Sequence, residues 1–240
     1  MTGDGDRPGP DSQRAHAPTP IEGRRSSRGL LAESSRVEAF SDGVLAIVIT
    51  LLVLDLRAPE KPGVMLDELL QQWPVYTAYL ASFGYVGVIW VNHHQLFTRI
   101  GAVDSGLLWR NLALLLTTSV LPFPTAVLGS AFEHGNHRDQ VVGLIFYALI
   151  SATMASSWLL LFHYLAVNQR LLAEHTPATF FAQERQRALI GVGFYLGAAL
   201  LALWQPIAGL LIACLLPVFY GLTSEGWSPY RNRRHRQARS

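Results

Sequence analysis

A single acid, Asp42, lies inside a long apolar stretch of this sequence and is the first residue that suggests specific chemistry. It precedes an uncharged run that extends from Gly43 to Leu54. A carboxylate inside a membrane-spanning helix costs on the order of 2.5–3.5 kcal/mol on insertion scales, so such a residue is normally retained for function and paired with a polar partner. The sequence therefore predicts a partner for Asp42 elsewhere in the chain.

A cluster of polar and aromatic residues around position 92 is the second place where chemistry is possible. His93 and His94 are adjacent, so on a helix their side chains point about 100° apart and cannot bind one metal ion as an i, i+4 pair does. We therefore expect no metal site there. We interpret Trp90, Asn92 and His93 as hydrogen-bonding partners for Asp42 or for other buried polar groups.

Common enzyme motifs are missing from the sequence. It has no H-E-x-x-H metalloprotease motif, no G-x-S-x-G nucleophile elbow and no nucleotide-binding glycine loop. The only cysteine, Cys214, lies in an apolar run and has no second cysteine for a disulfide or a zinc site. We predict neither an enzyme nor a protein with a bound cofactor, and we expect no nucleic-acid partner.

The composition indicates a membrane protein. Half of the 240 residues are hydrophobic and only 15% are charged. Apolar runs of suitable length predict an all-α protein with six transmembrane helices, at residues 36–55, 75–97, 106–128, 141–167, 188–203 and 207–220. We expect a disordered tail at residues 1–33, the six-helix unit at 34–222 and a basic tail at 223–240, with a short interfacial helix at 64–73.

The arginines and lysines predict the orientation of the chain in the membrane. With six spans both termini lie on the same side, and sixteen of the 19 arginine and lysine residues fall on that side. Positive charge favours the cytoplasm, so we predict a plasma-membrane protein with both termini cytoplasmic. The opposite, outer connections are acidic, which would concentrate cations near the mouth of a pore. The same acids are equally compatible with ordinary solvated loops.

One face of the first span is formed by four residues at helical spacing. Ile47, Thr50, Leu51 and Leu54 follow at i, i+3, i+4 and i+7, and Asp42 points away from this stripe. The spacing alone is equally compatible with a face that contacts lipid or packs inside the bundle.

The order of residues around this stripe resembles a known channel family. The string Arg36-x-x-x-Phe40-Ser41-Asp42-Gly43, followed by Ile47, Thr50-Leu51-Leu52 and Leu54, is similar to the R-x-x-x-F-S-D signature of the transmembrane protein 175 family of endosomal and lysosomal potassium channels. The W-x-N-H-H cluster at residues 90–94, Arg110-Asn111 and the L-P-F-P string at residues 121–124 also resemble that family. The resemblance covers about residues 36–128.

Several expectations follow from this resemblance and from nothing else. Animal members carry two six-helix repeats, whereas this chain has one signature, which implies the prokaryotic homotetramer with the first helix lining a central pore. Ile47 would form the hydrophobic constriction, Leu51 and Leu54 further apolar rings, and Thr50 a hydroxyl layer beside the permeating potassium ion. The remaining family positions would brace the pore helix against the second and third spans: Arg36, Phe40, Ser41, Asp42, Trp90, Asn92, His93 and Asn111.

The sequence thus favours a passive, potassium-selective cation channel in the lipid bilayer. A proton-coupled secondary transporter, in which Asp42 and His93 form a proton relay, is the main alternative. A membrane protein that assembles without conducting is the third. Saturable uptake driven by a pH gradient would identify the transporter, and an intact tetramer without potassium flux would identify the third class.

Overall fold

The chain folds almost entirely into helices. This computed structural model describes residues 20–59, 62–173 and 176–223, with side-chain surroundings given from residue 33 onward except at 178–179. In chain order the helices are α1 (Pro20–Leu51), the 3-10 turn η1 (Leu52–Asp55), α2 (Met65–Gln71), α3 (Trp73–Phe97), α4 (Ser105–Ser119), α5 (Pro122–His134), α6 (His137–Val167), the 3-10 turn η2 (Gln169–Leu171), α7 (Ala178–Ala202) and α8 (Pro206–Thr223).

Five stretches of the described chain are long and apolar enough to cross a membrane. They are Glu33–Asp55, Trp73–Phe97, Ser105–His134, His137–Val167 and Pro206–Thr223. Helix α7 is also 25 residues long, but its first half carries Glu184, Arg185 and Arg187, which lower its hydropathy. Many large apolar side chains on the outside of the bundle are exposed, among them Leu160, Leu200 and Leu215. Such a surface suits lipid, since a water-soluble protein rarely exposes so much contiguous apolar area.

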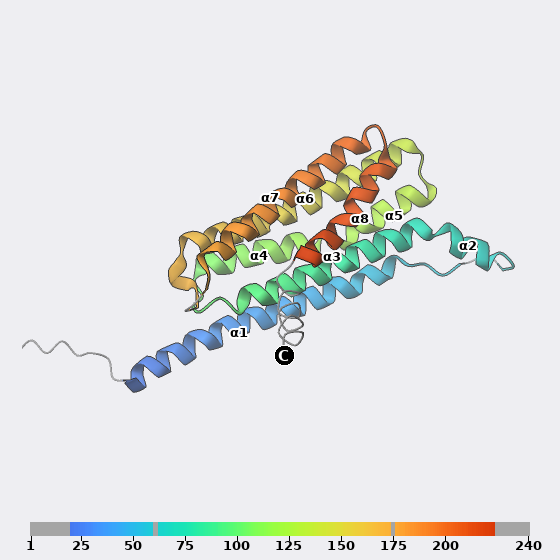
Figure 1. Cartoon of the computed structure of the whole chain (residues 1–240). Helices are drawn as coiled ribbons and strands as arrows, with labels where there is room; N and C mark the ends of the chain where they lie inside the picture. Colours follow the sequence, from blue (N-terminus) through green and yellow to red (C-terminus); the bar gives the residue numbers. More distant parts are fainter. Residues whose placement is uncertain (1–19, 60–61, 174–175, 224–240) are drawn as a thin grey trace, which may run out of the picture.

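Helix α6 forms the centre of the bundle. It packs against α4, α5, α7 and α8, and its side chains Leu144, Tyr147, Met154 and Leu161 are fully buried. Helix α1 lies along the outside next to α3, and its N-terminal part extends past the end of the bundle (Figure 1). It packs against α3 and α4.

The N-terminal end of the first helix differs from the prediction. We expected residues 1–33 to form a disordered tail, yet α1 begins at Pro20; residues 1–19 and the predicted basic tail from 224 onward lie outside the described residues. Proline suits the first turn of a helix, where its missing N–H would have no intrahelical acceptor. The alanines, leucines, glutamates and arginines that follow have high helix propensity.

Two further boundaries differ. The third predicted span is broken into α4 and α5 because Pro122 lacks the N–H that would continue the helix, and the second half runs on to His134. The fifth span, predicted at 188–203, begins earlier as helix α7 at Ala178, where the buried aromatic rings of Phe180 and Phe181 join the core. The predicted interfacial helix at 64–73 corresponds to α2, and the last two predicted spans correspond to α7 and α8, which pack together.

The loop between α3 and α4 contacts the segment that follows α6. Residues between α3 and α4 pair with those after α6, through hydrogen bonds from the Gly101 and Ala102 amides to the Leu171 carbonyl. Asp104 caps α4 by accepting from the Leu107 amide at 2.9 Å, and also accepts from the Tyr164 hydroxyl and Arg170. Burial tends to raise the pKa of Asp104, but these hydrogen bonds and the Arg170 charge outweigh it and lower the pKa below its usual value.

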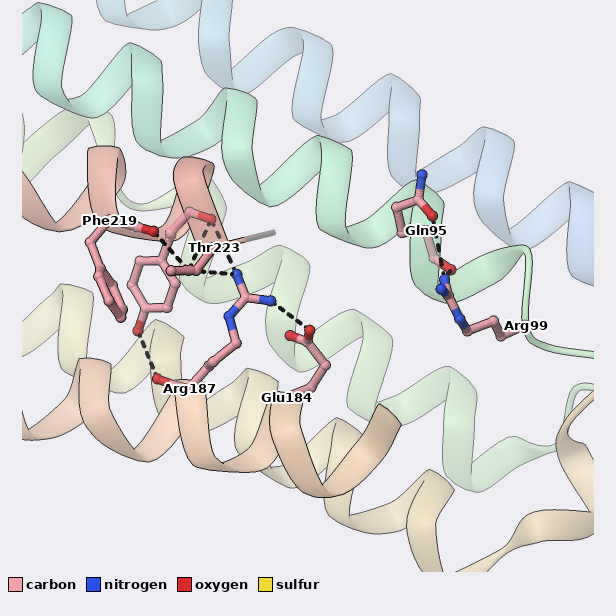
Figure 2. Close-up of polar contacts among 7 residues, drawn as sticks. Gln95, Arg99, Glu184, Arg187, Phe219 and Thr223 are labelled. Carbon is pink, nitrogen blue, oxygen red and sulfur yellow. Dashed lines mark hydrogen bonds and ion pairs between the residues drawn. The ribbon is translucent and has the colours of Figure 1, made fainter. Parts of the chain in front are cut away.

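An ion pair inside the bundle fixes α8 to α7. The Arg187 guanidinium donates to the Glu184 carboxylate at 2.5 Å, to the Tyr220 carbonyl at 3.1 Å and to the Thr223 hydroxyl at 3.1 Å (Figure 2). Both charged side chains are largely buried, at 14% and 11% exposure. Carbonyls in the last turn of a helix lack intrahelical donors, so Arg187 satisfies the end of α8 from a neighbouring helix.

Replacing Arg187 by methionine should destabilise the bundle by about 1.5–3 kcal/mol, because the buried Glu184 carboxylate loses its cation and α8 loses a cap. Thermal unfolding in detergent measures this change. The double variant Glu184→Gln with Arg187→Met should be closer to the parent, since it removes both charges. Gln186→Met, an exposed neighbour on the same helix, is the matched control. Equal melting temperatures for parent and Arg187→Met would contradict the assignment.

Candidate functional site

The two faces of α1 have opposite surroundings. Ser41, Leu45, Val48 and Leu52 are buried against the bundle, with at most 2% exposure each. The four residues of the predicted stripe, Ile47, Thr50, Leu51 and Leu54, are all exposed and lie on the side turned away from α3 and α4. We call these four residues the exposed stripe. Within residues 20–59, 62–173 and 176–223, the predicted pore-lining face therefore has no partner from its own bundle.

A buried chain of hydrogen bonds connects α1, α4 and α3. The Ser41 hydroxyl donates to the Val37 carbonyl at 2.9 Å, and the Asn111 amide nitrogen donates to the Ser41 oxygen at 2.9 Å. The Asn111 oxygen lies 3.0 Å from Nε2 of His93. Because the Asn111 nitrogen is used toward Ser41, its oxygen must accept from His93, which places a proton on Nε2 of the imidazole. Each of the three side chains is at most 2% exposed.

The intramembrane acid has a partner on α3. Nε1 of Trp90 donates to Oδ1 of Asp42 at 3.1 Å. This contact and the buried chain lie side by side, because Ser41 and Asp42 are consecutive on α1. We call the five residues Ser41, Asp42, Trp90, His93 and Asn111 the polar network.

One contact between α1 and α3 was not predicted. Nδ1 of His94 lies 2.8 Å from Oε1 of Glu38. Glu38 is four residues before Asp42, and His94 is four residues after Trp90, so the two contacts are one turn apart along antiparallel helices. The same four-residue spacing on both helices could have identified the pair of Glu38 and His94 from the sequence, once Trp90 had been recognised as the partner of Asp42.

Three predicted site residues lie outside these hydrogen bonds in the described part of the chain. Arg36 and Phe40 are exposed on α1. Asn92 faces a different part of the bundle, where it lines a small cavity of about 40 Å³ together with Glu184, Arg187 and aromatic side chains of α3, α6 and α8. The structure therefore brings together five of the eight predicted bracing residues and separates these three from them.

His93 and His94 face different partners, as their helical spacing predicts. His93 bonds to Asn111 and stacks on Phe97 with ring centroids 4.5 Å apart, whereas His94 bonds to Glu38. Among the described residues, no group of three or more histidine, cysteine or acidic side chains is arranged to hold a metal ion. Asp42 and His93 also bond to different residues, so within residues 20–59 and 62–173 the two members of the predicted proton relay share no direct hydrogen bond.

A polar cavity lies at the other end of α1. It has a volume of about 420 Å³ and is lined by residues that follow η1, by α2 and the start of α3, and by the end of α5. Three of its lining residues are acids, Asp55, Glu68 and Glu133, and Arg57 and His134 also line it. The acidic outer connections expected from the sequence thus meet close to the end of the exposed stripe.

Comparison with known proteins identifies relatives of the whole membrane unit. A sequence profile described as endosomal/lysosomal potassium channel TMEM175 matches residues 36–122. A potassium channel of Streptomyces collinus is 38% identical over 192 residues, which are 79% of this chain and 92% of that protein. An endosomal/lysosomal proton channel TMEM175 of Gallus gallus is 36% identical over 114 residues, 43% of this chain and 23% of that protein.

A solved structure has the same fold. The crystal structure of a lysosomal potassium-selective channel TMEM175 homolog from Chamaesiphon minutus superposes with a TM-score of 0.70 at 31% identity, and the match covers 80% of this chain and 97% of that one. The family consists of channels, which confirms the prediction that the chain is not an enzyme. The identity and coverage also confirm the resemblance inferred from the signature residues: this chain belongs to the TMEM175 family of membrane channels.

Proposed function

We propose that the chain is a passive, potassium-selective channel of the plasma membrane whose pore is lined by the first helices of four identical chains. The observation that carries this proposal is the asymmetry of α1. One face is fixed to α3 and α4 by the polar network, while the exposed stripe on the other face has no partner among the residues that the structure describes. The names of the relatives in Streptomyces collinus and Chamaesiphon minutus support potassium as the permeating ion.

The topology that we propose has six spans and cytoplasmic termini. Helix α7 supplies the sixth span, because it is as long as α3 and packs along α6 and α8. Its charged first half is then near the cytoplasmic boundary, where Arg187 and Glu184 neutralise each other. The excess of arginines on this side favours the cytoplasm.

The exposed stripe supports assembly through α1, and the number of four chains comes from the family resemblance. Four copies that face one another with this stripe enclose an axis, and each α1 then covers the apolar surface of its neighbours. In this arrangement Ile47 forms the constriction, and Leu51 and Leu54 form further apolar rings. Apolar rings can gate an ion pathway by excluding water until the ring widens.

Thr50 supplies the one hydroxyl of the stripe. Its Oγ1 donates to the Ala46 and Ile47 carbonyls of its own helix at 3.0 and 2.8 Å. The hydroxyl hydrogen is therefore used inside α1, and the oxygen lone pairs are directed outward. Four such oxygens suit partial replacement of the hydration shell of a potassium ion.

The signature residues hold the pore helix in place. A bilayer offers no water to satisfy polar groups, so the hydrogen bonds of Ser41, Asp42 and Asn111 fix the rotation of α1 about its axis. Arg36 and Phe40 continue the same outward face toward the inner mouth. The acidic cavity beside Asp55 attracts cations to the outer mouth.

Flux measurements with potassium, sodium and protons in turn test the proposal. In reconstituted liposomes we expect conductive potassium flux without a pH gradient. Saturable transport driven only by a pH gradient would favour the coupled transporter with Asp42 and His93. A tetramer without flux of any of the three ions would favour the non-conducting class. The proton flux measurement also tests whether this chain conducts protons, since the relative from Gallus gallus is named a proton channel.

Truncation of the constriction should increase potassium flux. We expect Ile47→Ala and Ile47→Asn to raise the flux severalfold, because a smaller or polar side chain keeps the pathway wetted. Ile207→Ala is the matched control, since Ile207 on α8 has the same 60% exposure as Ile47. Flux that is equal in Ile47→Ala and Ile207→Ala would exclude Ile47 from the constriction.

Removal of the central amide should loosen the pore helix. Asn111→Ala deletes two buried hydrogen bonds and strands the Nε2–H of His93, which should cost about 2–4 kcal/mol and reduce the tetramer fraction. Thermal unfolding and native mass spectrometry in detergent measure the two effects. Ser119→Ala on the same helix is the control, because that exposed hydroxyl bonds to the Leu116 carbonyl of its own helix. Similar stabilities of the two variants would argue against a bracing role.

A further inference from the structure

The polar cavity at the C-terminal end of α1 lies apart from the polar network, and its lining has the composition of a ligand site. We propose that this cavity binds a linear organic diamine, with its two ammonium groups held between η1, α2 and α5. Binding itself requires no assumption about conduction, whereas the effect of the diamine on potassium flux rests on the proposed function.

Charge sets the first requirement on the ligand. Three carboxylates line the cavity, Asp55 from η1, Glu68 from α2 and Glu133 from α5, and one guanidinium, that of Arg57, lines it with them. With histidine counted as neutral, three negative groups and one positive group give the described lining a formal charge of −2. A cavity whose walls carry mainly one sign of charge concentrates ions of the opposite sign. A dication therefore complements this lining.

A buried amide in the wall of the cavity points to a bound molecule. Gln72 joins α2 to α3, and its backbone is fixed on both sides, since its N–H donates to the Glu68 carbonyl and its carbonyl accepts from the Tyr76 amide. Gln72 lines the cavity and is only 9% exposed, yet its side chain has no hydrogen-bond partner among the described residues. Oδ2 of Asp55 is likewise buried without a partner in that part of the chain. Oxygen acceptors that lack a donor suit ammonium groups, which only donate.

The size of the cavity and the separation of its acids favour an organic cation over a metal ion. One water molecule needs about 10–15 Å³ of such volume. The volume of about 420 Å³ therefore leaves room for a ligand of several heavy atoms. Among the residues that the structure describes, no three acidic, histidine or cysteine side chains are placed to share a metal ion. Two charges that are separated by methylene groups can reach different carboxylates, and Val75 and Ala126 in the same lining offer apolar contacts to the methylenes.

A diamine in this cavity changes the charge beside the exposed stripe. Asp55 directly follows Leu54, the last residue of the stripe, so the ligand lies next to the proposed outer mouth of the pore. Two positive charges there offset the charge of the lining and lower the local concentration of potassium ions. The potassium flux should therefore decrease as the site fills.

Calorimetric titration of the purified protein in detergent tests the site directly. The probe is putrescine, the linear four-carbon diamine, and the comparison is butylamine, which has the same chain but one charge. At equal ionic strength we expect saturable binding of putrescine, at least about tenfold tighter than that of butylamine, because the second ammonium adds a charge-assisted hydrogen bond. Equal binding of the two amines would overturn the proposal. Magnesium ions that bind more tightly than putrescine and displace it would assign the cavity to inorganic dications and would also overturn it.

Two variants locate the binding site. Glu133→Gln removes one carboxylate, and Gln72→Met removes the buried amide at nearly unchanged size. We expect the affinity for putrescine to fall about tenfold in the first and about three- to tenfold in the second. Asp67→Asn is the matched control, because Asp67 is the exposed neighbour of Glu68 on α2 and is not among the described residues that line this cavity. An equal loss of affinity in Asp67→Asn and in Glu133→Gln would overturn the assignment in favour of general surface charge.

Potassium flux in liposomes, with putrescine on both sides, tests the consequence for conduction. Saturating putrescine should reduce the flux of the parent about two- to fivefold, and Glu133→Gln should require a higher concentration for the same reduction. Binding in the calorimeter with unchanged flux would overturn the effect on conduction and retain the site. A parent that conducts no potassium even without putrescine would overturn the proposed function, and the calorimetric binding would still decide the site.

Discussion

The hydrogen bond from the Asn111 amide to the Ser41 hydroxyl is the contact on which the arrangement of the first helix depends. Asn111 is a single side chain of α4 that reaches both α1 and α3, because its other end accepts from His93. In a membrane interior an unsatisfied amide or imidazole N–H costs several kcal/mol, so the three groups have one favourable arrangement. That arrangement sets the rotation of α1, and the rotation decides which residues form the exposed stripe.

Helix α3 transmits this constraint to the rest of the bundle. Asn92, His93 and His94 follow one another and therefore point in three directions, each toward a different neighbour. Asn92 lines the cavity beside α7 and α8, His93 bonds to α4, and His94 bonds to α1. The ion pair of α7, which caps α8, lines the same cavity as Asn92.

The sequence predicted the helices and their partners better than it predicted their ends. The helical spacing of Ile47, Leu51 and Leu54 predicted that they share one face of the first span. The second span has few polar residues, which left Trp90 and His93 as candidate hydrogen-bonding partners of Asp42. Ser41 and Asn111 could be included only through the family signature, since a serine and an asparagine carry no spacing signal of their own. The roles of these residues in a pore remain predictions.

Features that depend on tertiary contacts could not be predicted from local patterns. In the sequence, Glu184 and Arg187 resemble residues of a solvated loop. They can be buried in a helix because they form an ion pair with each other and because Arg187 donates to a carbonyl at the end of α8. The pairing of Glu38 with His94 requires the register of two helices, which was not known until Asp42 was matched with Trp90. Likewise, the apolar run at 106–128 predicts one span, but packing against neighbouring helices decides whether the chain bends at Pro122 or separates into two helices.

Polar and apolar contacts are unevenly distributed along α1, and this bears on how the proposed hydrophobic constriction can change width. The directional contacts to α3 and α4 are made by Glu38, Ser41 and Asp42, in the N-terminal half of the span. The C-terminal half contacts the bundle through the buried apolar side chains of Leu45, Val48 and Leu52. Hydrogen bonds weaken steeply with misalignment, whereas apolar contacts are non-directional and tolerate small rotations and shifts. The helix is thus anchored where its signature lies and less constrained where Ile47 to Leu54 lie, so a small tilt about the anchored half moves the exposed stripe most.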